Sequence, residues 1–213
     1  MHHVIRLLSR VVDRYAPSRI LSFDLAHVFK TMQMMETGKV SRSKLIQEMK
    51  LGEGSIKTLV KHLKMNDLIE SSNAGMWLTN KGRTVYMKLC SVIPAEIDIP
   101  KCSIALSRYN HAVLIRGFAY SVRTGIEQRD IAIKNGAIGA TTLIFRDGKL
   151  TMPNKIQDAL RKEPKTYDLI ITHLRPEEGD VIIITSSYDR KTAEMSAKST
   201  ALQIISEHEK HSS

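Results

Sequence analysis

The fold of this chain is decided by residues 38–83, which read GKVSRSKLIQEMKLGEGSIKTLVKHLKMNDLIESSNAGMWLTNKGR. Four hydrophobic residues near its middle recur at the spacing i, i+3, i+4 and i+7: Ile56, Leu59, Val60 and Leu63. This spacing places them on one face of an α-helix, which must pack against the rest of the protein. The opposite face carries lysines and hydroxyl groups, so the sequence predicts a helix with one buried and one basic surface.

The flanking residues predict the elements around this helix. Ser41 or Ser43 can cap a preceding helix, and the glycines of residues 51–54 permit a sharp turn between the two helices. Two short strands are predicted at residues 68–71 and 76–78, because turn-forming residues separate them. Helix, turn, helix and β-hairpin in this order indicate a winged helix-turn-helix domain.

The end of this stretch, Leu78–Arg83 (LTNKGR), carries a more specific signal. It resembles the Leu-Thr-x-x-Gly-Arg run with which many bacterial and archaeal winged-helix regulators leave the second wing strand and enter a closing helix. In such domains the second helix of the helix-turn-helix lies in the major groove of DNA.

The domain is therefore predicted to bind double-stranded DNA, with a recognition helix at about residues 53–65 and a wing at about 68–78. The residues expected to meet bases or phosphates are Arg42, Lys44, Ser55, Lys57, Thr58, Lys61, His62, Lys64, Asn73, Lys81 and Arg83. Two alternatives stay open: a winged helix can serve as a protein-interaction module, and His62 can be an exposed histidine without a role. Trp77 is more typical of a core anchor than of a base-stacking group.

Positive charge is concentrated in the N-terminal half of the chain. Residues 1–93 contain 15 Lys and Arg against 7 Asp and Glu, whereas residues 94–213 contain 17 against 15. The net charge of +10 therefore comes mainly from the half with the predicted helix-turn-helix. Such asymmetry is typical of a phosphate-binding surface. A membrane partner is not predicted, because no long apolar run or basic amphipathic terminus supports it.

The composition is typical of a soluble two-domain protein. At 213 residues, with 42% hydrophobic and 25% charged residues, the chain can bury two modest cores. The apolar run Val4–Val12 is interrupted by Arg6 and Arg10 and lacks the cleavage site of a signal peptide. Cys90 and Cys102 have no metal-ligand spacing. A cytoplasmic location is expected, and neither a metal nor a cofactor is predicted.

Two further helices are predicted before residue 38. One covers about His3–Tyr15, and the other begins near Ser22 and runs towards Gly38 as the opening helix of the winged-helix domain. The first of these is additional. It is expected either to pair across a homodimer, which suits palindromic DNA sites, or to pack back on its own domain.

The chain is predicted to divide into an N-terminal domain (1–92), a linker (93–110) that contains Pro94 and Pro100, and a C-terminal domain (111–213). The predicted C-terminal strands and helices cover residues 111–117, 125–135, 140–145, 149–152, 155–174, 180–185 and 189–206. Their order, βαββαβα, predicts an α/β sandwich that is ferredoxin-like or related, so the whole chain is α+β. Residues 168–172 fit a helix or a strand.

Two places in the C-terminal domain are candidates for binding a small anionic effector. Residues 123–130 lead into a helix, and residues 186–189 connect an apolar strand to another helix; helix N-termini attract anions. The predicted ligand-binding residues are Arg116, Arg123, Thr124, Gln128, Arg129, Ser186 and Ser187. The alternative is that these residues only cap helices or face water.

Several stretches together carry a resemblance that spans nearly the whole chain. They are residues 16–23 (APSRILSF), 26–28 (AHV), 51–55 (LGEGS), 125–130 (GIEQRD), 139–143 (GATTL) and 176–181 (PEEGDV). In these stretches the chain resembles archaeal winged helix-turn-helix transcriptional regulators with a C-terminal domain of unknown function. The resemblance implies a regulator of transcription and specifies neither an effector nor a DNA site.

Enzymatic activity is not predicted, because the chain has no Gly-rich phosphate loop, Ser-His-Asp order or metal-binding cysteine pair. Glu127 and Asp130 share a helical face, where a solvated or capping role is favoured over acid–base catalysis. The sequence thus predicts a DNA-binding transcriptional regulator, a homodimer whose C-terminal domain senses a small ligand or mediates dimerisation. The competing hypothesis is a ligand-binding or enzymatic C-terminal domain, with the winged helix as a protein-interaction module.

Overall fold

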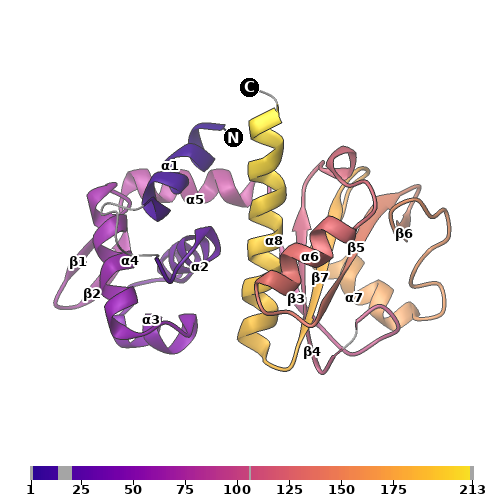
Figure 1. The fold of residues 1–213 in the computed structure, drawn as a ribbon, viewed down its shortest axis with the longest axis horizontal. Coiled ribbons are helices and arrows are strands. Elements are labelled where there is room, and N and C mark those ends of the chain that lie inside the picture. Colours follow the sequence, from indigo (N-terminus) through magenta and orange to yellow (C-terminus); the bar gives the residue numbers. More distant parts are fainter. Residues whose placement is uncertain (1, 14–20, 106, 212–213) are drawn as a thin grey trace. The chain divides into compact units, whose positions relative to one another are not determined.

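The computed structural model describes residues 2–13, 21–105 and 107–211. The chain forms two compact units, Met1–Leu89 and Cys90–Ser213 (Figure 1). The N-terminal unit consists of helices with a wing-like β-hairpin, and the C-terminal unit consists of a five-stranded antiparallel sheet with helices. The chain is therefore α+β, as its sequence predicts.

In the N-terminal unit, helices precede and follow the hairpin. The elements are α1 (His2–Val12), α2 (Leu25–Glu36), α3 (Arg42–Met49), α4 (Glu53–Met65), β1 (Ile69–Ser72), β2 (Gly75–Leu78) and α5 (Asn80–Cys90). Lys50 ends α3 in the left-handed conformation (φ 54°), and Gly52 is the N-cap of α4, which gives the sharp turn between them. Val40 exchanges two backbone hydrogen bonds of 2.9 Å with Met76 and so extends the hairpin by one bridge.

The additional helix α1 packs on α2 and α4 of its own unit. Its residues Val4, Ile5, Leu8 and Val11 are buried. Of the two alternatives for this helix, packing back on its own domain is therefore confirmed. The predicted end of the helix at Tyr15, and residues 16–20 of the family resemblance, lie outside the described residues.

The C-terminal unit is built on one five-stranded antiparallel sheet, in which the strand order differs from the order along the chain. Its elements are β3 (Glu96–Ile99), β4 (Tyr109–Ile115), the 3-10 turn η1 (Ala119–Ser121), α6 (Ile126–Lys134), β5 (Gly139–Arg146), β6 (Lys149–Thr151), α7 (Pro164–Leu174), β7 (Val181–Ser187) and α8 (Arg190–His211). The strand order is β3-β4-β7-β5-β6, with every neighbouring pair antiparallel. Residues 168–172, which fit either type of element, lie in the helix α7.

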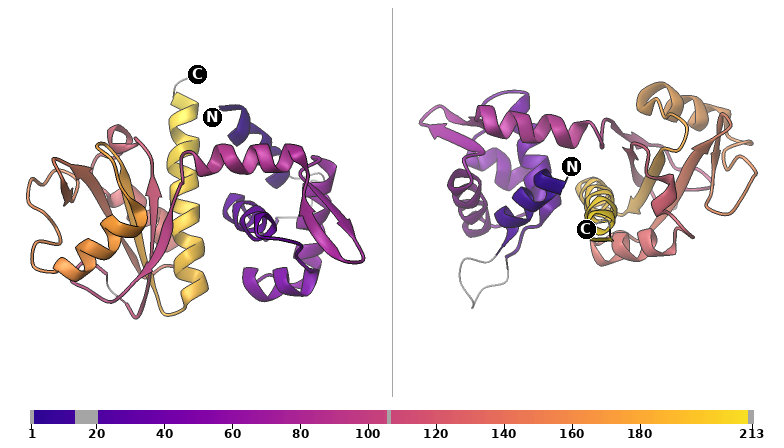
Figure 2. Two further views of the ribbon diagram at one scale, coloured as in Figure 1. Left: turned by 180° about the vertical axis from the view of Figure 1, so that it is seen from behind. Right: turned by 90° about the horizontal axis from the view of Figure 1, so that it is seen from above.

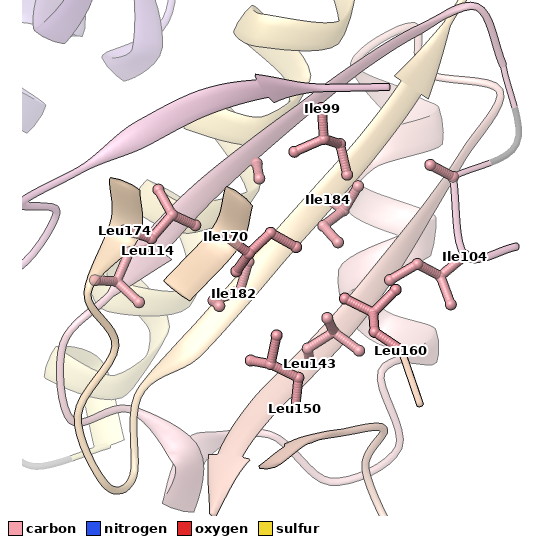
Figure 3. Close-up of a cluster of buried hydrophobic side chains, with 12 residues drawn as sticks. Ile99, Ile104, Leu114, Leu143, Leu150, Leu160, Ile170, Leu174, Ile182 and Ile184 are labelled. Carbon is pink, nitrogen blue, oxygen red and sulfur yellow. The ribbon is translucent and has the colours of Figure 1, made fainter. Parts of the chain in front are cut away.

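Strand residues alternate between the two faces of this sheet. One face packs with α7 into an apolar core that includes Leu114, Leu143, Ile170, Ile182 and Ile184 (Figure 3). The helices α6 and α8 cover the opposite face, as the right-hand view of Figure 2 shows. β7, which is buried along its whole length, holds the centre of the sheet because it is rich in isoleucine.

Two predictions about the C-terminal unit need correction. Residues 93–110 do not form a free linker, because β3 within them pairs with β4, with Asp98 opposite His111. From β4 to α8 the elements follow the predicted chain order βαββαβα. The prediction that their strands are arranged in the sheet as in a ferredoxin-like fold is wrong. In a ferredoxin-like sheet the third strand lies between the first two. Here the last strand, β7, lies between β4 and β5, and the short β6 stays at the edge beside its hairpin partner.

Candidate nucleic-acid interface

The helix α4 has one buried face and one basic face. Ile56, Leu59 and Leu63 are fully buried. Lys57, Lys61 and Lys64 are exposed, and their spacing of i, i+4 and i+7 places them along one line on the helix surface. We call these three residues the lysine stripe. Exposed lysines in a row place several positive charges on one side of the helix, and nucleic-acid phosphates attract such charges.

Hydroxyl groups lie beside the lysine stripe near the start of α4. Ser55 and Thr58 are half-buried, and the Thr58 hydroxyl donates a hydrogen bond of 2.9 Å to the carbonyl oxygen of Gly54. The Thr58 oxygen can still accept a hydrogen bond from outside the protein. The structure therefore presents donors and acceptors next to cations, as a base-reading surface requires.

A shallow hollow lies between the start of α3 and the wing. The hollow has a volume of about 230 Å³ and is lined by residues 40–42 and 71–76. Arg42 is exposed at its rim, whereas Lys44 is bonded to Glu48 over 3.0 Å. Asn73 is exposed at the wing tip, as predicted. The hollow is open to solvent and carries a predicted contact residue on each side.

The wing is held to α4 and carries a further cation. The Lys64 ammonium group donates a hydrogen bond to the Ser71 hydroxyl, which joins the end of the lysine stripe to β1. Lys39 lies over the indole ring of Trp77, with its nitrogen 5.1 Å from the ring centroid. A cation–π contact of this kind orients a lysine without neutralising it. Sequence reasoning missed Lys39, because its partner Trp77 belongs to a distant strand.

The prediction that His62 faces DNA is wrong. His62 is buried (5% exposed), and its Nδ1 donates a hydrogen bond of 2.7 Å to the Val11 carbonyl oxygen. Its ring also meets the Phe23 ring edge-on, with the centroids 5.6 Å apart. His62 therefore anchors the end of α1 to α4. In the isolated helix it lies at the border of the apolar face, and only the packing of α1 covers it.

Lys81 and Arg83, predicted to reach the DNA backbone behind the wing, have partners within the protein. Lys81 donates to the Asn66 carbonyl oxygen over 2.8 Å, and Arg83 forms an ion pair of 2.6 Å with Glu36. Both side chains are about half-exposed. These contacts attach the start of α5 to α2 and to the end of α4, so their first role in the structure is internal.

The spacing of Thr79 and Gly82 in LTNKGR has a geometric cause in this fold, where the two residues act together. The Thr79 hydroxyl accepts a hydrogen bond from the Gly82 amide over 2.9 Å and donates one to the Asp67 carbonyl over 2.6 Å. Thr79 thus caps α5. A Cβ atom on Gly82 would lie 2.0 Å from the Leu68 carbonyl oxygen, so only glycine fits at this position.

Among the predicted ligand-binding residues of the C-terminal unit, Arg116 lies far from Ser186 and Ser187. Arg116 follows the end of β4 that pairs with Val181, whereas Ser186 lies opposite Asn110 near the other end of the same strand pair. At about 3.4 Å per residue, these ends are separated by most of the length of the strands. Arg116 therefore does not share a site with Ser186 and Ser187.

Internal hydrogen bonds account for several of these residues. Arg116 bonds to the buried Asp180 over 2.8 Å, and the Ser186 hydroxyl donates to Asn110 over 2.7 Å. Ser187 is buried in the sheet. The cap of α6 is Gly125 (φ 81°) rather than Thr124, whose hydroxyl accepts from the Ile126 amide over 3.2 Å. These four predicted ligand residues thus hold turns and strands in place.

Residues around the start of α6 have mixed surroundings. Arg123 and Arg129 are exposed, and Arg129 lies 3.4 Å from the Asp130 carboxylate. Gln128 is buried, and its Oε1 has no hydrogen-bond partner among the residues that the structure describes. An effector at this place stays a prediction, as does the homodimer.

Within the described ranges, no group of three or more His, Cys, Asp or Glu side chains is arranged to hold a metal ion. In the same part of the chain, no helix combines the length and apolar character needed to cross a membrane.

The chain combines two domains that are each similar to a described family. Residues 25–84 match the family described as PH0730-like, N-terminal domain, and residues 106–204 match a domain of unknown function, DUF4443. No curated protein matches the chain.

One solved structure extends this similarity over both units. It is the hypothetical protein PH0730 from Pyrococcus horikoshii OT3, with 26% sequence identity and a TM-score of 0.73. The match covers 87% of this chain and 95% of that chain. The two-part architecture is thus shared with an archaeal protein.

Proposed function

We propose that the N-terminal unit is a winged helix-turn-helix that binds double-stranded DNA, and that the chain is a DNA-binding transcriptional regulator. In this proposal α4 enters the major groove and the hairpin β1–β2 contacts the backbone beside it. The observation that carries the proposal is the lysine stripe, which is exposed opposite the fully buried residues Ile56, Leu59 and Leu63.

The structure narrows the set of residues proposed to contact DNA. The lysine stripe and Arg42 are proposed to meet phosphates, and Ser55 and Thr58 to meet base edges or phosphates. Lys39 and Asn73 are proposed to meet the backbone at the wing. His62 is excluded by its burial, and Lys81 and Arg83 are given a structural role by their internal partners.

A titration of duplex DNA with the full chain tests this proposal. Fluorescence anisotropy of a labelled mixed-sequence duplex is measured over a series of salt concentrations. The double variant Lys57→Ala, Lys61→Ala is expected to bind about tenfold or more weakly, and the slope of log K against log salt is expected to fall by about 2. Each lysine that leaves a phosphate removes about one released counterion from the equilibrium.

A matched control separates a local contact from a change in overall charge. Lys162 and Lys165 are exposed in the C-terminal unit, so the double variant Lys162→Ala, Lys165→Ala removes the same charge elsewhere. This control is expected to keep the affinity and the salt slope of the unmodified protein. Equal losses in both double variants, or no binding by the unmodified protein at low salt, would refute the proposed interface.

A further inference from the structure

A cluster of charged side chains lies between the edge strand β3 and the helix α8. Along β3, Ile97 and Ile99 pack towards the core that contains α7, so Glu96 and Asp98 lie on the opposite face of the sheet. On that face they meet His111 of β4 and the first half of α8. The sequence pattern does not predict this cluster, because Pro94 and Pro100 indicate a linker at residues 93–110.

His111 is the central group of the cluster. It is buried (6% exposed), and its Nδ1 donates a hydrogen bond of 2.7 Å to Asp98. Its Nε2 lies 3.6 Å from the Glu96 carboxylate, too far for an ordinary hydrogen bond. The imidazole ring is therefore bracketed by two carboxylates of the same strand.

The helix α8 supplies the remaining charges. Lys198, which is fully buried, bonds to Glu96 and also lies 3.0 Å from Glu194. Arg190 donates to Asp98 over 2.6 Å. The neighbouring strand β7 places Thr185 opposite His111, and this side chain does not titrate; its hydroxyl donates to the Ala193 carbonyl oxygen.

The charges of this cluster balance in only one state of His111. Glu96, Asp98 and Glu194 supply three negative charges, whereas Lys198 and Arg190 supply two positive charges. A protonated His111 supplies the third. A neutral His111 leaves an excess negative charge in a buried place, which is unfavourable.

We propose that His111 is a pH-sensitive latch that holds β3 on the sheet while the imidazole is protonated and releases β3 when it is deprotonated. β3 is suited to release, because it has four residues and pairs with β4 alone. The chain reaches β3 from α5 through residues 91–95 only. Release of β3 therefore frees residues 96–99, between α5 and β4, from the edge of the sheet.

The titration of the neighbouring groups agrees with this arrangement. Burial disfavours the imidazolium, but the hydrogen bond to Asp98 and the nearby Glu96 outweigh it, so the pKa of His111 is raised above its usual value. Burial opposes the charge of Glu96, yet His111 and Lys198 lower its pKa far below the usual range. The hydrogen bond from His111 lowers the pKa of Asp98. Both carboxylates thus stay ionised while His111 titrates.

The sign of the pH effect follows from these directions. A histidine with a raised pKa in the folded state stabilises the fold fully below its unfolded pKa, about 6.5. This stabilisation is lost as the pH rises through the raised pKa of the folded state. The latch therefore closes at mildly acidic pH and opens at alkaline pH.

Hydrogen exchange of the full chain tests the latch. The rates of peptides that cover residues 95–100 are measured at about pH 6 and about pH 8.5 and corrected for intrinsic exchange. Protection of β3 is expected to be lower at the higher pH, because deprotonation of His111 removes the imidazolium that Asp98 and Glu96 hold. The variant His111→Gln is expected to show low protection at both pH values.

Two further measurements keep the result unambiguous. The exposed His173 of α7 provides a matched control, and His173→Gln is expected to keep the pH profile of the unmodified protein. If His111→Gln does not fold, an NMR titration of His111 in the unmodified chain decides. Protection of β3 that does not depend on pH, an unchanged profile in His111→Gln, or a His111 pKa at or below the ordinary value overturns the proposal. None of these readouts involves DNA, so the latch is tested independently of the proposed function.

Discussion

Replacement of Gly82 by alanine is expected to destabilise the N-terminal unit strongly. The Cβ atom of alanine would lie 2.0 Å from the Leu68 carbonyl oxygen and 3.0 Å from its carbonyl carbon. Because both atoms belong to the backbone, α5 must move away from the turn between α4 and β1. This movement stretches the hydrogen bonds that Thr79 makes there, with its amide to Leu68 (3.1 Å) and its hydroxyl to Asp67 (2.6 Å).

The size of the effect follows from these contacts. Forced overpacking costs about 1–3 kcal/mol, and two weakened hydrogen bonds cost about 1 kcal/mol each. Alanine regains about 1 kcal/mol through its higher helix propensity. The free energy of unfolding is therefore expected to fall by about 2–4 kcal/mol, which lowers the melting temperature of a unit of this size by about 10–25 °C.

The fluorescence of Trp77 reports this unfolding selectively. Trp77 is the only tryptophan of the chain, and it lies in β2 of the N-terminal unit. Thermal and urea unfolding are followed by its emission in the unmodified protein and in Gly82→Ala. Gly54→Ala is the matched control, because no atom lies within 4 Å of the added Cβ atom. This control is expected to leave stability unchanged or to raise it by up to about 1 kcal/mol.

An unchanged melting temperature in Gly82→Ala would refute the close approach of α5 to Leu68. Equal destabilisation in Gly54→Ala would show that the loss arises from glycine replacement in general. Only a large loss at Gly82 with none at Gly54 agrees with the structure.

Two further substitutions test internal contacts. His62→Phe keeps a ring of similar size but leaves the Val11 carbonyl without its donor, so the free energy of unfolding in urea should fall by about 1–3 kcal/mol. The DNA affinity of the folded protein should not change. A loss of DNA affinity without a loss of stability would return His62 to the interface. Asp180→Asn removes the charge that Arg116 and the Gly117 and Glu177 amides share within 2.8 Å. When unfolding is followed by circular dichroism, the free energy of unfolding should fall by about 2–4 kcal/mol. Replacement of the exposed Glu177 by glutamine should lower it by less than about 1 kcal/mol. Similar losses in the two variants would contradict the buried role of Asp180.

Sequence patterns were sufficient to predict features that depend only on residues of the same helix or hairpin. The spacing of Ile56, Leu59 and Leu63 fixes which face of α4 is buried, because helical geometry is local. The hairpin formed by β1 and β2, which is predicted at residues 68–71 and 76–78, is likewise set by neighbours in the chain. These features concern residues within a few positions of each other.

Sequence patterns failed where burial depends on a distant segment. His62 bonds to Val11, 51 residues away, and nothing in α4 alone shows that α1 covers it. β3 was missed because its four residues stand between Pro94 and Pro100, although Glu96–Ile99 alternates charged and apolar residues. Its partner strand and the helix that covers its charged face come from elsewhere in the chain.

The sequence by itself determined a basic N-terminal unit of helices with a wing-like hairpin, and a C-terminal unit of strands and helices. Local periodicity, caps and turns decide such elements, since they depend on chain geometry over a few residues. Only the tertiary structure decided the strand order, the separation of Arg116 from Ser186, and the burial of His62, His111 and Lys198. The physical reason is that exposure of a side chain depends on which element covers it, and that element is chosen by packing of the whole unit.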